Sequence, residues 1–151
     1  MKKIRILVGI PCSGKSTYIH VNYITHLDTY YISRDEIRDV FKLHQYTKES
    51  EQKVTDLFKM QLSNYLSAPH ILTIILDNTH VKEKYIDSII TEHLDCIIEI
   101  KFFDVSLLKA HYRNIIRYIT TGKWIPISVM NNMYKSYNKI NKQKYAKYMV
   151  H

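Results

Sequence analysis

The stretch that decides the fold occupies residues 9–17 and reads Gly9-Ile10-Pro11-Cys12-Ser13-Gly14-Lys15-Ser16-Thr17. It completes the phosphate-binding pattern G-x-x-x-x-G-K-[ST], and the apolar run at 4–8 just before it is typical of a buried strand. Gly9 and Gly14 allow backbone angles that a residue with a Cβ resists, so successive N–H groups can turn inward around a phosphate. The sequence therefore predicts a nucleotide-binding chain.

The loop also predicts two ligands, ATP and Mg²⁺. Lys15 is expected to bridge the outer phosphates and the Ser16 hydroxyl to hold Mg²⁺, while the helix that follows directs its positive end at the anion. The other loop residues expected to bind ATP are Gly9, Pro11, Cys12, Ser13, Gly14 and Thr17.

The composition indicates a single domain over residues 1–151, since a chain of this length with 46% hydrophobic residues is short for two cores. Cys12 and Cys96 form neither a disulfide framework nor a paired metal spacing, and the eight histidines are scattered. No stretch approaches the roughly 18 apolar residues that span a membrane. We therefore expect a cytoplasmic protein with no membrane partner, and the sequence leaves homo-oligomerisation open. The Tyr, Ile, Lys and Asn content is typical of AT-rich genomes, those of viruses and phages included.

The net charge of +8 is concentrated in the last third of the chain. Residues 1–100 carry 12 Lys and Arg against 13 Asp and Glu, whereas residues 101–151 carry 10 against Asp104 alone. Such a basic segment favours a polyanionic partner through counterion release and steering. The alternative is a solvated lysine-rich face, which charge alone does not distinguish.

Strands and helices are expected to alternate along the chain. Apolar and β-branched runs predict strands at 4–8, 29–32, 71–76 and 97–103. Helical spacing predicts helices at about 16–27, 48–66, 82–94 and 106–119, a short one after Ser33 and Glu36, which have capping-box spacing, and a last one from 127 towards the C-terminus. This alternation predicts an α/β, P-loop NTPase-type three-layer fold with a mainly parallel, roughly four- to five-stranded central sheet flanked by helices.

The phosphate loop, Asp35 and Asp77 each follow a predicted strand, and ligands of parallel sheets bind beyond the carboxyl ends of the strands. We expect Asp77 to hold Mg²⁺ through water, with Asn78, Thr79 and His80 as polar neighbours. The alternative is that Asp77 is a turn residue or a helix cap at the strand end.

Asp35 and Arg38 lie three residues apart on a predicted helix and so share one face. A carboxylate there could orient and deprotonate an attacking hydroxyl, and an arginine could grip a phosphate already on the acceptor. The alternatives are a helix-dipole partner and a surface salt bridge.

Arg113 and Arg117 are four residues apart on the predicted penultimate helix, within a predicted lid at about 110–126. A mobile arginine can stabilise a phosphoryl transfer when such a segment closes over the nucleotide, and the alternative is a solvated basic helix face.

The basic helical segment at about 127–151 interleaves lysines with Tyr134, Tyr137, Tyr145 and Tyr148. This pattern could stack bases and bind phosphates, but packing of the tyrosines onto the core is the favoured interpretation.

Taken together, these motifs resemble the kinase domain of polynucleotide 5′-hydroxyl kinases of the T-even phage type. The landmarks beyond the phosphate loop are Ser33-Arg34-Asp35-Glu36-Ile37-Arg38, Asp77-Asn78-Thr79-His80, Lys101-Phe102-Phe103-Asp104-Val105 and Ile125-Pro126-Ile127-Ser128. The resemblance covers essentially the whole chain, and Cys12 stands where this family often has Gly. The chain contains no D-x-D-x-T box, so the resemblance implies a kinase without 3′-phosphatase activity.

The resemblance also implies roles for individual residues. Lys15 and Ser16 bind the ATP phosphates and Mg²⁺, Asp35 is the general base for a 5′-hydroxyl, and Arg38 contacts the adjacent phosphate of the acceptor. Asp77 and Thr79 order the site, and Arg117 is the lid arginine, with Arg113 nearby.

The resulting hypothesis is transfer of the γ-phosphoryl group of ATP to the 5′-hydroxyl end of DNA or RNA in end repair. Two alternatives remain from the residues alone, since P-loop folds host many functions. One is a P-loop kinase for a nucleoside or metabolite, and the other is a non-catalytic, nucleotide-gated nucleic-acid-binding module.

Overall fold

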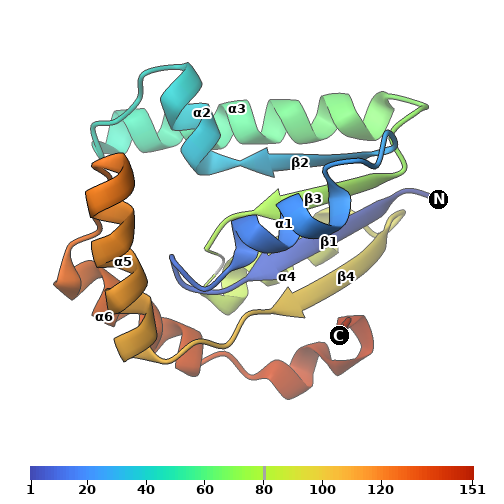
Figure 1. The fold of residues 1–151 in the computed structure, drawn as a ribbon. Helices are drawn as coiled ribbons and strands as arrows, with labels where there is room; N and C mark the ends of the chain where they lie inside the picture. Colours follow the sequence, from blue (N-terminus) through green and yellow to red (C-terminus); the bar gives the residue numbers. More distant parts are fainter. Residues whose placement is uncertain (80) are drawn as a thin grey trace.

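The structure, a computed structural model, describes residues 1–79 and 81–151 and has three layers (Figure 1). In this part of the chain, four parallel strands form the sheet in the order β2-β3-β1-β4. The strands are β1 (Lys3–Val8), β2 (Thr29–Ser33), β3 (Thr73–Asp77) and β4 (Ile97–Phe102). The helices are α1 (Lys15–Tyr23), α2 (Arg34–Val40), α3 (Lys48–Ser67), α4 (Glu83–Glu92), α5 (Leu107–Thr121) and α6 (Ile127–Asn138), followed by the 3₁₀ helix η1 (Lys142–Tyr148). The predicted α/β fold class is confirmed.

The two central strands, β1 and β3, bring the predicted sites together. Ile74, Ile75 and Leu76 of β3 are fully buried, as expected of a parallel strand covered on both faces. In the pairing register, Asp77 at the end of β3 lies opposite both Leu7 of β1 and Ser33 of β2. The carboxyl ends of three strands therefore meet at one edge, where the phosphate loop, α2 and the segment after β3 begin.

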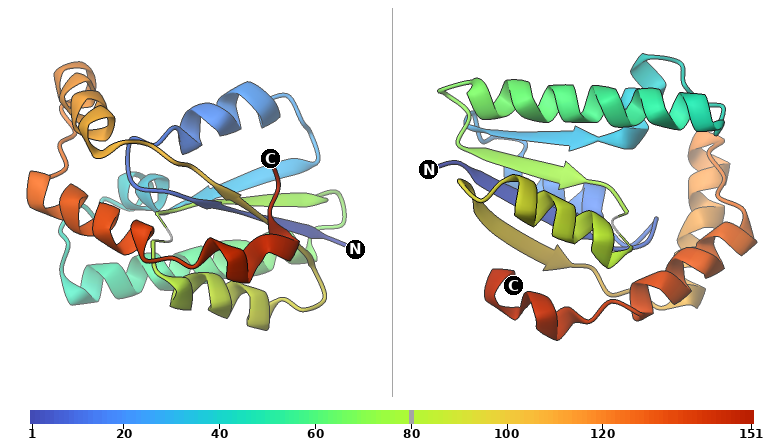
Figure 2. Two further views of the ribbon diagram at one scale, coloured as in Figure 1. Left: turned by 90° about the horizontal axis from the view of Figure 1, so that it is seen from below. Right: turned by 180° about the vertical axis from the view of Figure 1, so that it is seen from behind.

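Alternation along the strands divides the core between the two faces of the sheet. Ile4, Ile6 and Val8 of β1 belong to the larger core with α3 and α4, whereas Leu7 packs with Ile19 of α1 on the opposite face. Figure 2 shows α1 on one face and α3 and α4 on the other, with α5 and α6 beyond the carboxyl ends of the strands.

The α1 face of β1 and β4 carries a cluster of charges. The Arg5 guanidinium donates to Glu99 (Nε to Oε2, 2.8 Å), and Lys3 forms an ion pair with the other oxygen of Glu99 at 2.9 Å. Partial burial acts to raise the pKa of Glu99, but the hydrogen bonds from Lys3 and Arg5 outweigh it and hold that pKa below its usual value. These ion pairs link the first strand of the chain to β4.

Side-chain caps fix the starts of α2 and α3. Ser33 accepts from the backbone N–H of Glu36 at 3.5 Å, which is half of the predicted capping box, and Thr47 accepts from the N–H of Ser50 at 3.1 Å. The Glu36 carboxylate accepts instead from the Tyr31 hydroxyl at 2.6 Å. In a full capping box the Glu36 carboxylate would accept from the backbone N–H of Ser33, but here it accepts from Tyr31 of β2.

Two predicted helices were wrong in extent. The first ends at Tyr23 and not near residue 27, because Val21, Ile24 and Leu27 are 76%, 67% and 91% exposed and find no core to offset their weak helix propensity. The last helix breaks after Asn138 into the separate 3₁₀ helix η1.

The segment that follows the break returns along the sheet. The backbone N–H of Asn141 donates to Glu83 of α4 at 2.7 Å, and Tyr145 of η1 is 1% exposed in the core. Met149 then forms a parallel bridge with Ile100 of β4, and the N–H of Val150 donates to the Ile100 carbonyl at 3.0 Å. We predicted a sheet of four to five strands. The described residues form four, and the C-terminal segment adds a single bridge to β4 where a fifth strand would have paired.

Among the described residues, no helix combines the length and apolar character that crossing a membrane requires.

Candidate active site

The phosphate loop joins β1 to α1 in a conformation that its sequence dictates. A Cβ on Gly9 would lie 2.6 Å from Ser13 Oγ and 3.0 Å from Phe103 Cβ, so a side chain there would collide. Gly14 has φ 106°, which glycine adopts without cost, and Cys12 adopts the left-handed φ of 62° despite its Cβ. The loop therefore curls tightly enough for its N–H groups to point at an anion.

Lys15 is buried beneath this loop. Its ammonium donates to the carbonyls of Gly9 and Ile10, each at 2.9 Å. These hydrogen bonds hold the lysine within the loop, which is the predicted ATP site. Burial lowers the pKa of Lys15 to about 8, against the opposing charges of Asp77 and Asp35. Two carboxylates thus act electrostatically on the lysine of the phosphate loop.

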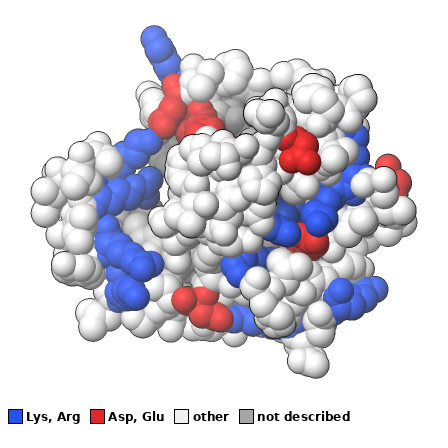
Figure 3. All heavy atoms as spheres, turned by 45° about the vertical axis from the view of Figure 1, so that its right-hand side comes forward, with Lys and Arg blue, Asp and Glu red and all other residues white. Residues whose placement is uncertain are grey.

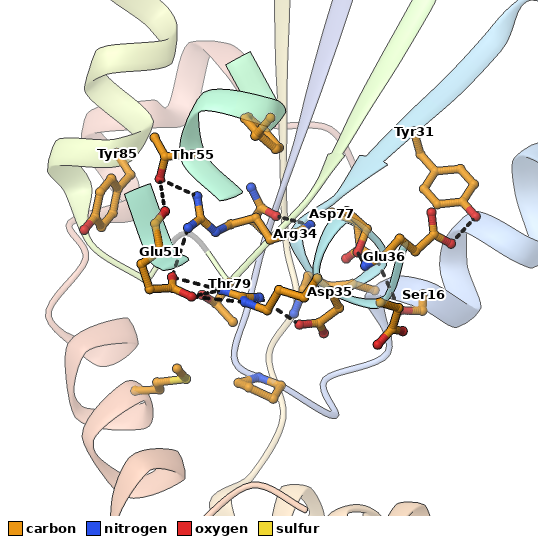
Figure 4. A pocket seen from close by; sticks show the side chains of 18 of the residues that line it. Ser16, Tyr31, Arg34, Asp35, Glu36, Glu51, Thr55, Asp77, Thr79 and Tyr85 are labelled. Carbon is orange, nitrogen blue, oxygen red and sulfur yellow. Dashed lines mark hydrogen bonds and ion pairs between the residues drawn. The ribbon is translucent and has the colours of Figure 1, made fainter. Parts of the chain in front are cut away.

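Ser16 and Asp77 fit the predicted Mg²⁺ site. The Ser16 hydroxyl donates to Asp77 Oδ2 at 3.3 Å, which places a hydroxyl and a carboxylate side by side (Figure 4). Burial raises the pKa of Asp77, and the charge of Lys15 only partly opposes this effect. A hard cation prefers oxygen ligands and would stabilise a carboxylate that burial has destabilised. The two side chains would hold the ion, and it would supply neutralisation of phosphate charge.

No group of three His, Cys, Asp or Glu suited to a metal occurs in residues 1–79 and 81–151. Mg²⁺ in phosphate-binding enzymes commonly has phosphate and water oxygens among its ligands.

The two polar residues after Asp77 tie the segments of the site together. Asn78 Oδ1 accepts from the backbone N–H of Arg34 at 3.2 Å, and the Thr79 carbonyl accepts from the N–H of Gly9 at 3.3 Å. His80, which the sequence also placed here, lies outside the described residues. The strand end at β3 therefore anchors both the start of α2 and the start of the phosphate loop.

Asp35 and Arg38 form the pair that their spacing predicted. Arg38 Nη1 donates to Asp35 Oδ1 at 3.1 Å, and the Asp35 side chain is 64% exposed to the cleft. Both residues line the same cleft as the phosphate loop, which has a volume of about 2530 Å³. An accessible carboxylate and a fixed guanidinium therefore face the predicted ATP site.

Glu51 of α3 completes this cluster and was not predicted from the sequence. Its two carboxylate oxygens accept from Nε and Nη2 of Arg38 at 3.0–3.1 Å, and Oε2 also accepts from Arg34 at 3.0 Å. Partial burial acts to raise the pKa of Glu51, but Arg38 and then Arg34 outweigh it and hold that pKa below its usual value. Glu51 thus fixes the guanidinium of Arg38 beside Asp35. No local signal marks it, because 13 residues separate it from Arg38.

The two arginines of α5 differ in their partners. Arg113 Nη1 donates to the Cys12 carbonyl at 3.0 Å and so binds the phosphate loop directly. The Arg117 guanidinium lines the cleft and makes no hydrogen bond or ion pair with a described residue, and its charge acts to lower the pKa of Lys15. Arg117 is therefore available to a ligand while Arg113 supports the loop.

Two further contacts fix the connection between α5 and α6, which borders the cleft. The side chain of Asn114, fully buried, donates to the Ile125 carbonyl at 2.8 Å and accepts from the Ile125 N–H at 3.3 Å. Lys123 forms an ion pair with Asp39 of α2 at 2.8 Å. Neither contact was predicted, although a polar residue at helical spacing from the buried Ala110 is a signal that could have indicated Asn114.

Among the described residues, every predicted site residue except Gly9 lines the cleft, and these are Pro11, Cys12, Ser13, Gly14, Lys15, Ser16, Thr17, Asp35, Arg38, Asp77, Asn78, Thr79, Arg113 and Arg117. Gly9 lies at the base of the loop.

The C-terminal tyrosines, by contrast, pack as the favoured interpretation predicted. Tyr137 and Tyr145 are 4% and 1% exposed, and their hydroxyls donate to Asp104 and Asp87 at 2.7 and 2.8 Å. Acidic side chains from the first part of the chain pair with lysines of the last, as Lys144 does with Asp87 at 2.7 Å. The face drawn in Figure 3 correspondingly shows basic side chains in several groups with acidic ones between them.

With this geometry established, comparison with known proteins defines the family. The sequence pattern of the AAA domain family matches residues 4–140, which is most of the chain. The chain belongs to this family. The phosphate loop and helices α1 to α6 all lie within the matched residues.

Several solved structures are similar to this chain. A chain from the structure of the Pnkp1/Rnl/Hen1 RNA repair complex is 25% identical, with a TM-score of 0.81 over 95% of this chain. A gluconokinase from Sinorhizobium meliloti 1021 is 14% identical over 99% of this chain, and Chaetomium thermophilum Kti12 in complex with ADP-AlF3 is 18% identical over 93%, both with a TM-score of 0.59. The matches cover 80% of the gluconokinase chain and 82% of the Kti12 chain, and at these identities they show a shared fold alone. The domain spans 46% of the length of the repair-complex chain.

Proposed function

We propose that this domain is a polynucleotide 5′-hydroxyl kinase, which transfers the γ-phosphoryl group of ATP to the 5′-hydroxyl end of DNA or RNA. The observation that carries the proposal is the pair of Asp35 and Arg38, held at 3.1 Å at the sheet edge that also holds the phosphate loop. The likeness to a chain of an RNA repair complex supports a nucleic-acid acceptor.

In the proposed reaction, Asp35 is the general base. Its exposed carboxylate accepts the proton of the 5′-hydroxyl as the O–P bond to the γ-phosphorus forms and the bond to the β–γ bridging oxygen breaks, which releases ADP. Lys15 offsets the charge that develops on the phosphates, and Ser16 and Asp77 would hold a Mg²⁺, which would neutralise part of that charge. Much of the rate enhancement comes from holding the attacking and leaving oxygens in line with the γ-phosphorus, because the protein takes little part in covalent chemistry during phosphoryl transfer.

Arg38 is the proposed contact to the phosphate next to the 5′-end. Nε and Nη2 of its guanidinium donate to Glu51, and Nη1 donates to Asp35, so the second N–H of Nη1 is the one proposed to face the acceptor. A charge-assisted hydrogen bond from this N–H to a phosphate oxygen would place the terminal hydroxyl near Asp35. The 5′-terminal sugar would thus lie between the base and the phosphate loop.

Arg117 is the proposed lid arginine, and the proposed lid comprises residues 110–126. Three observations support this role. Arg117 lines the cleft, its guanidinium makes no hydrogen bond or ion pair with a described residue, and its charge acts to lower the pKa of Lys15. Arg113 would hold the loop in shape through the Cys12 carbonyl. Met130 of α6 and Tyr145 of η1 are buried in the core, which supports placing residues 127–151 in the same domain as the proposed lid.

The experiment that tests the function is transfer of labelled γ-phosphate from ATP and Mg²⁺ to a short oligonucleotide with a free 5′-hydroxyl. A 5′-phosphorylated oligonucleotide is the control, and a panel of nucleosides and sugar acids is run beside it. We expect label on the 5′-hydroxyl oligonucleotide only. Label confined to a small molecule would replace the proposal with a small-molecule kinase, and ATP binding without any transfer would replace it with a nucleotide-gated binding module.

A further inference from the structure

The cleft has a second arm that the reaction itself does not use. It runs between α3 and α4 on the face of the sheet opposite α1, and the left-hand view of Figure 2 shows both helices on that face. We define the α3–α4 groove by Phe58, Lys59 and Leu62 of α3 and Lys84, Tyr85 and Ile89 of α4, all of which line the cleft. We propose that this groove binds the single-stranded nucleotides of the acceptor that follow its 5′-end, an inference that rests on the proposed function.

Continuity with the Arg38 site is the first support. Glu51, which holds Arg38, and Thr55, which accepts from Arg34 at 3.1 Å, stand one turn apart on α3, and the next turn brings Phe58 and Lys59. In Figure 4, Ser16 and Asp77 lie on one side of Asp35, and Glu51, Thr55 and Tyr85 lie on the other. A strand whose end is at Asp35 and whose first phosphate is at Arg38 is thereby directed toward Tyr85 and the groove.

The chemistry of the groove is the second support. Phe58 and Leu62 are 8% and 5% exposed and form an apolar floor, whereas Lys59 and Lys84 stand exposed on opposite rims. Tyr85 is 49% exposed at the entrance, and the Lys84 ammonium lies 4.9 Å from the centroid of its ring. Stackable aromatic surface beside cations is how proteins bind single strands without reading their sequence. An exposed ring and a lysine on each rim therefore favour a polynucleotide.

The length of the groove sets the size of the site. Lys84, Tyr85 and Lys59 lie near its entrance, whereas Glu92 and His93 line its far end, where a carboxylate disfavours a phosphate. The rise of α3 from Glu51 to Leu62 is about 17 Å, which at a stacked spacing of about 3.4 Å corresponds to about five nucleotides. We expect affinity to increase with acceptor length up to about this number and then to level off.

The test compares acceptors of increasing length with the full chain. KM is measured at saturating ATP for a nucleoside 3′-phosphate, which reaches only the Arg38 site, and for single-stranded 5′-hydroxyl oligonucleotides of two to about eight nucleotides. Tyr85→Ala is expected to raise KM for the longer acceptors about five- to hundredfold. Tyr85→Phe is expected to keep the KM of the unaltered chain, because stacking needs the ring and not the hydroxyl. Lys59→Ala is expected to lower the salt dependence of binding by about 0.7 in the logarithmic slope.

Two control variants carry the same changes outside the groove. Lys53→Ala removes an exposed lysine of α3 that pairs with Glu49 at 3.5 Å, and Tyr112→Ala removes a 63% exposed tyrosine of α5. Neither residue lines the cleft, so both variants should keep the length dependence of the unaltered chain.

The outcomes separate this inference from the proposed function. A KM that is the same for the nucleoside 3′-phosphate and every oligonucleotide would leave the kinase assignment standing and overturn the groove as a strand path. The groove is equally overturned if Tyr85→Ala affects all acceptors to the same extent or none of them, and it would then be a candidate contact for a protein. If no 5′-hydroxyl acceptor is labelled at all, the function fails and the inference fails with it.

Discussion

Replacement of Glu51 tests whether the orientation of Arg38 governs use of the acceptor. Glu51 accepts three hydrogen bonds from Arg38 and one from Arg34, and its side chain is 35% exposed. A hydrogen bond to a charged group contributes about 1.5–3 kcal/mol when fully desolvated, and solvent at this partly exposed site reduces the value toward 1 kcal/mol. Glu51→Gln keeps one acceptor oxygen and turns an NH₂ group toward Arg38, so the guanidinium loses part of its hold.

The expected result is a rise of about tenfold in KM for a 5′-hydroxyl oligonucleotide, equivalent to about 1.4 kcal/mol. The KM for ATP and kcat at saturating acceptor should change by less than about twofold, since Lys15 and Asp35 are untouched. Initial rates with acceptor and ATP varied separately provide the three constants. Glu49→Gln is the matched control, because Glu49 lies on the same helix with 82% exposure and, within residues 1–79 and 81–151, forms an ion pair with Lys53 alone. An unchanged acceptor KM in a folded Glu51→Gln protein would refute the role of Glu51.

Four further changes have expected outcomes. Asp35→Asn should lower turnover by about 10²–10⁴-fold and leave ATP affinity intact in calorimetry; near-normal turnover would remove Asp35 as the base. Cys12→Gly should raise the free energy of unfolding by about 0.5–1 kcal/mol in urea denaturation, because it relieves a left-handed residue; a loss of stability would contradict this. Asn114→Ala should lower it by about 2 kcal/mol, since the partly buried N–H and C=O groups of Ile125 lose their partner, and a melting temperature within a degree or so of the original would count against that. Glu99→Gln should destabilise at pH 7, and the difference in the free energy of unfolding should shrink on acidification: the pKa of Glu99 is depressed in the folded state, so its contribution is present above its ordinary value and disappears as pH falls through the folded value.

Much of the site could be predicted because it is encoded locally. The phosphate loop needs glycine where φ is 106° and where a Cβ would collide, and these constraints leave a readable pattern at Gly9 and Gly14. Asp77 is the last residue of an apolar strand, and Ser33 caps the helix that carries Asp35. Parallel strands bring such ends to one edge whatever the connections between them.

What the sequence did not reveal depends on contacts between distant segments. Glu51 and Asn114 are ordinary polar residues of helices, and their importance arises only when α2 and the α5–α6 connection pack against them. The early end of α1 likewise reflects the lack of a core against which Leu27 could pack. The break after Asn138 accompanies a hydrogen bond from Asn141 to Glu83, which is 58 residues away. Local propensity is weak where tertiary contacts decide.

The bridge between Ile100 and Met149 has a consequence for synthesis of the protein. β4 lies at the edge of the sheet, and its outer backbone is paired only when Met149 and Val150 arrive. At about 5–20 residues per second, the roughly fifty residues that separate Ile100 from Val150 take several seconds to be translated. During that interval an otherwise assembled sheet presents an open strand edge, the surface on which nascent chains pair with one another or are captured by chaperones.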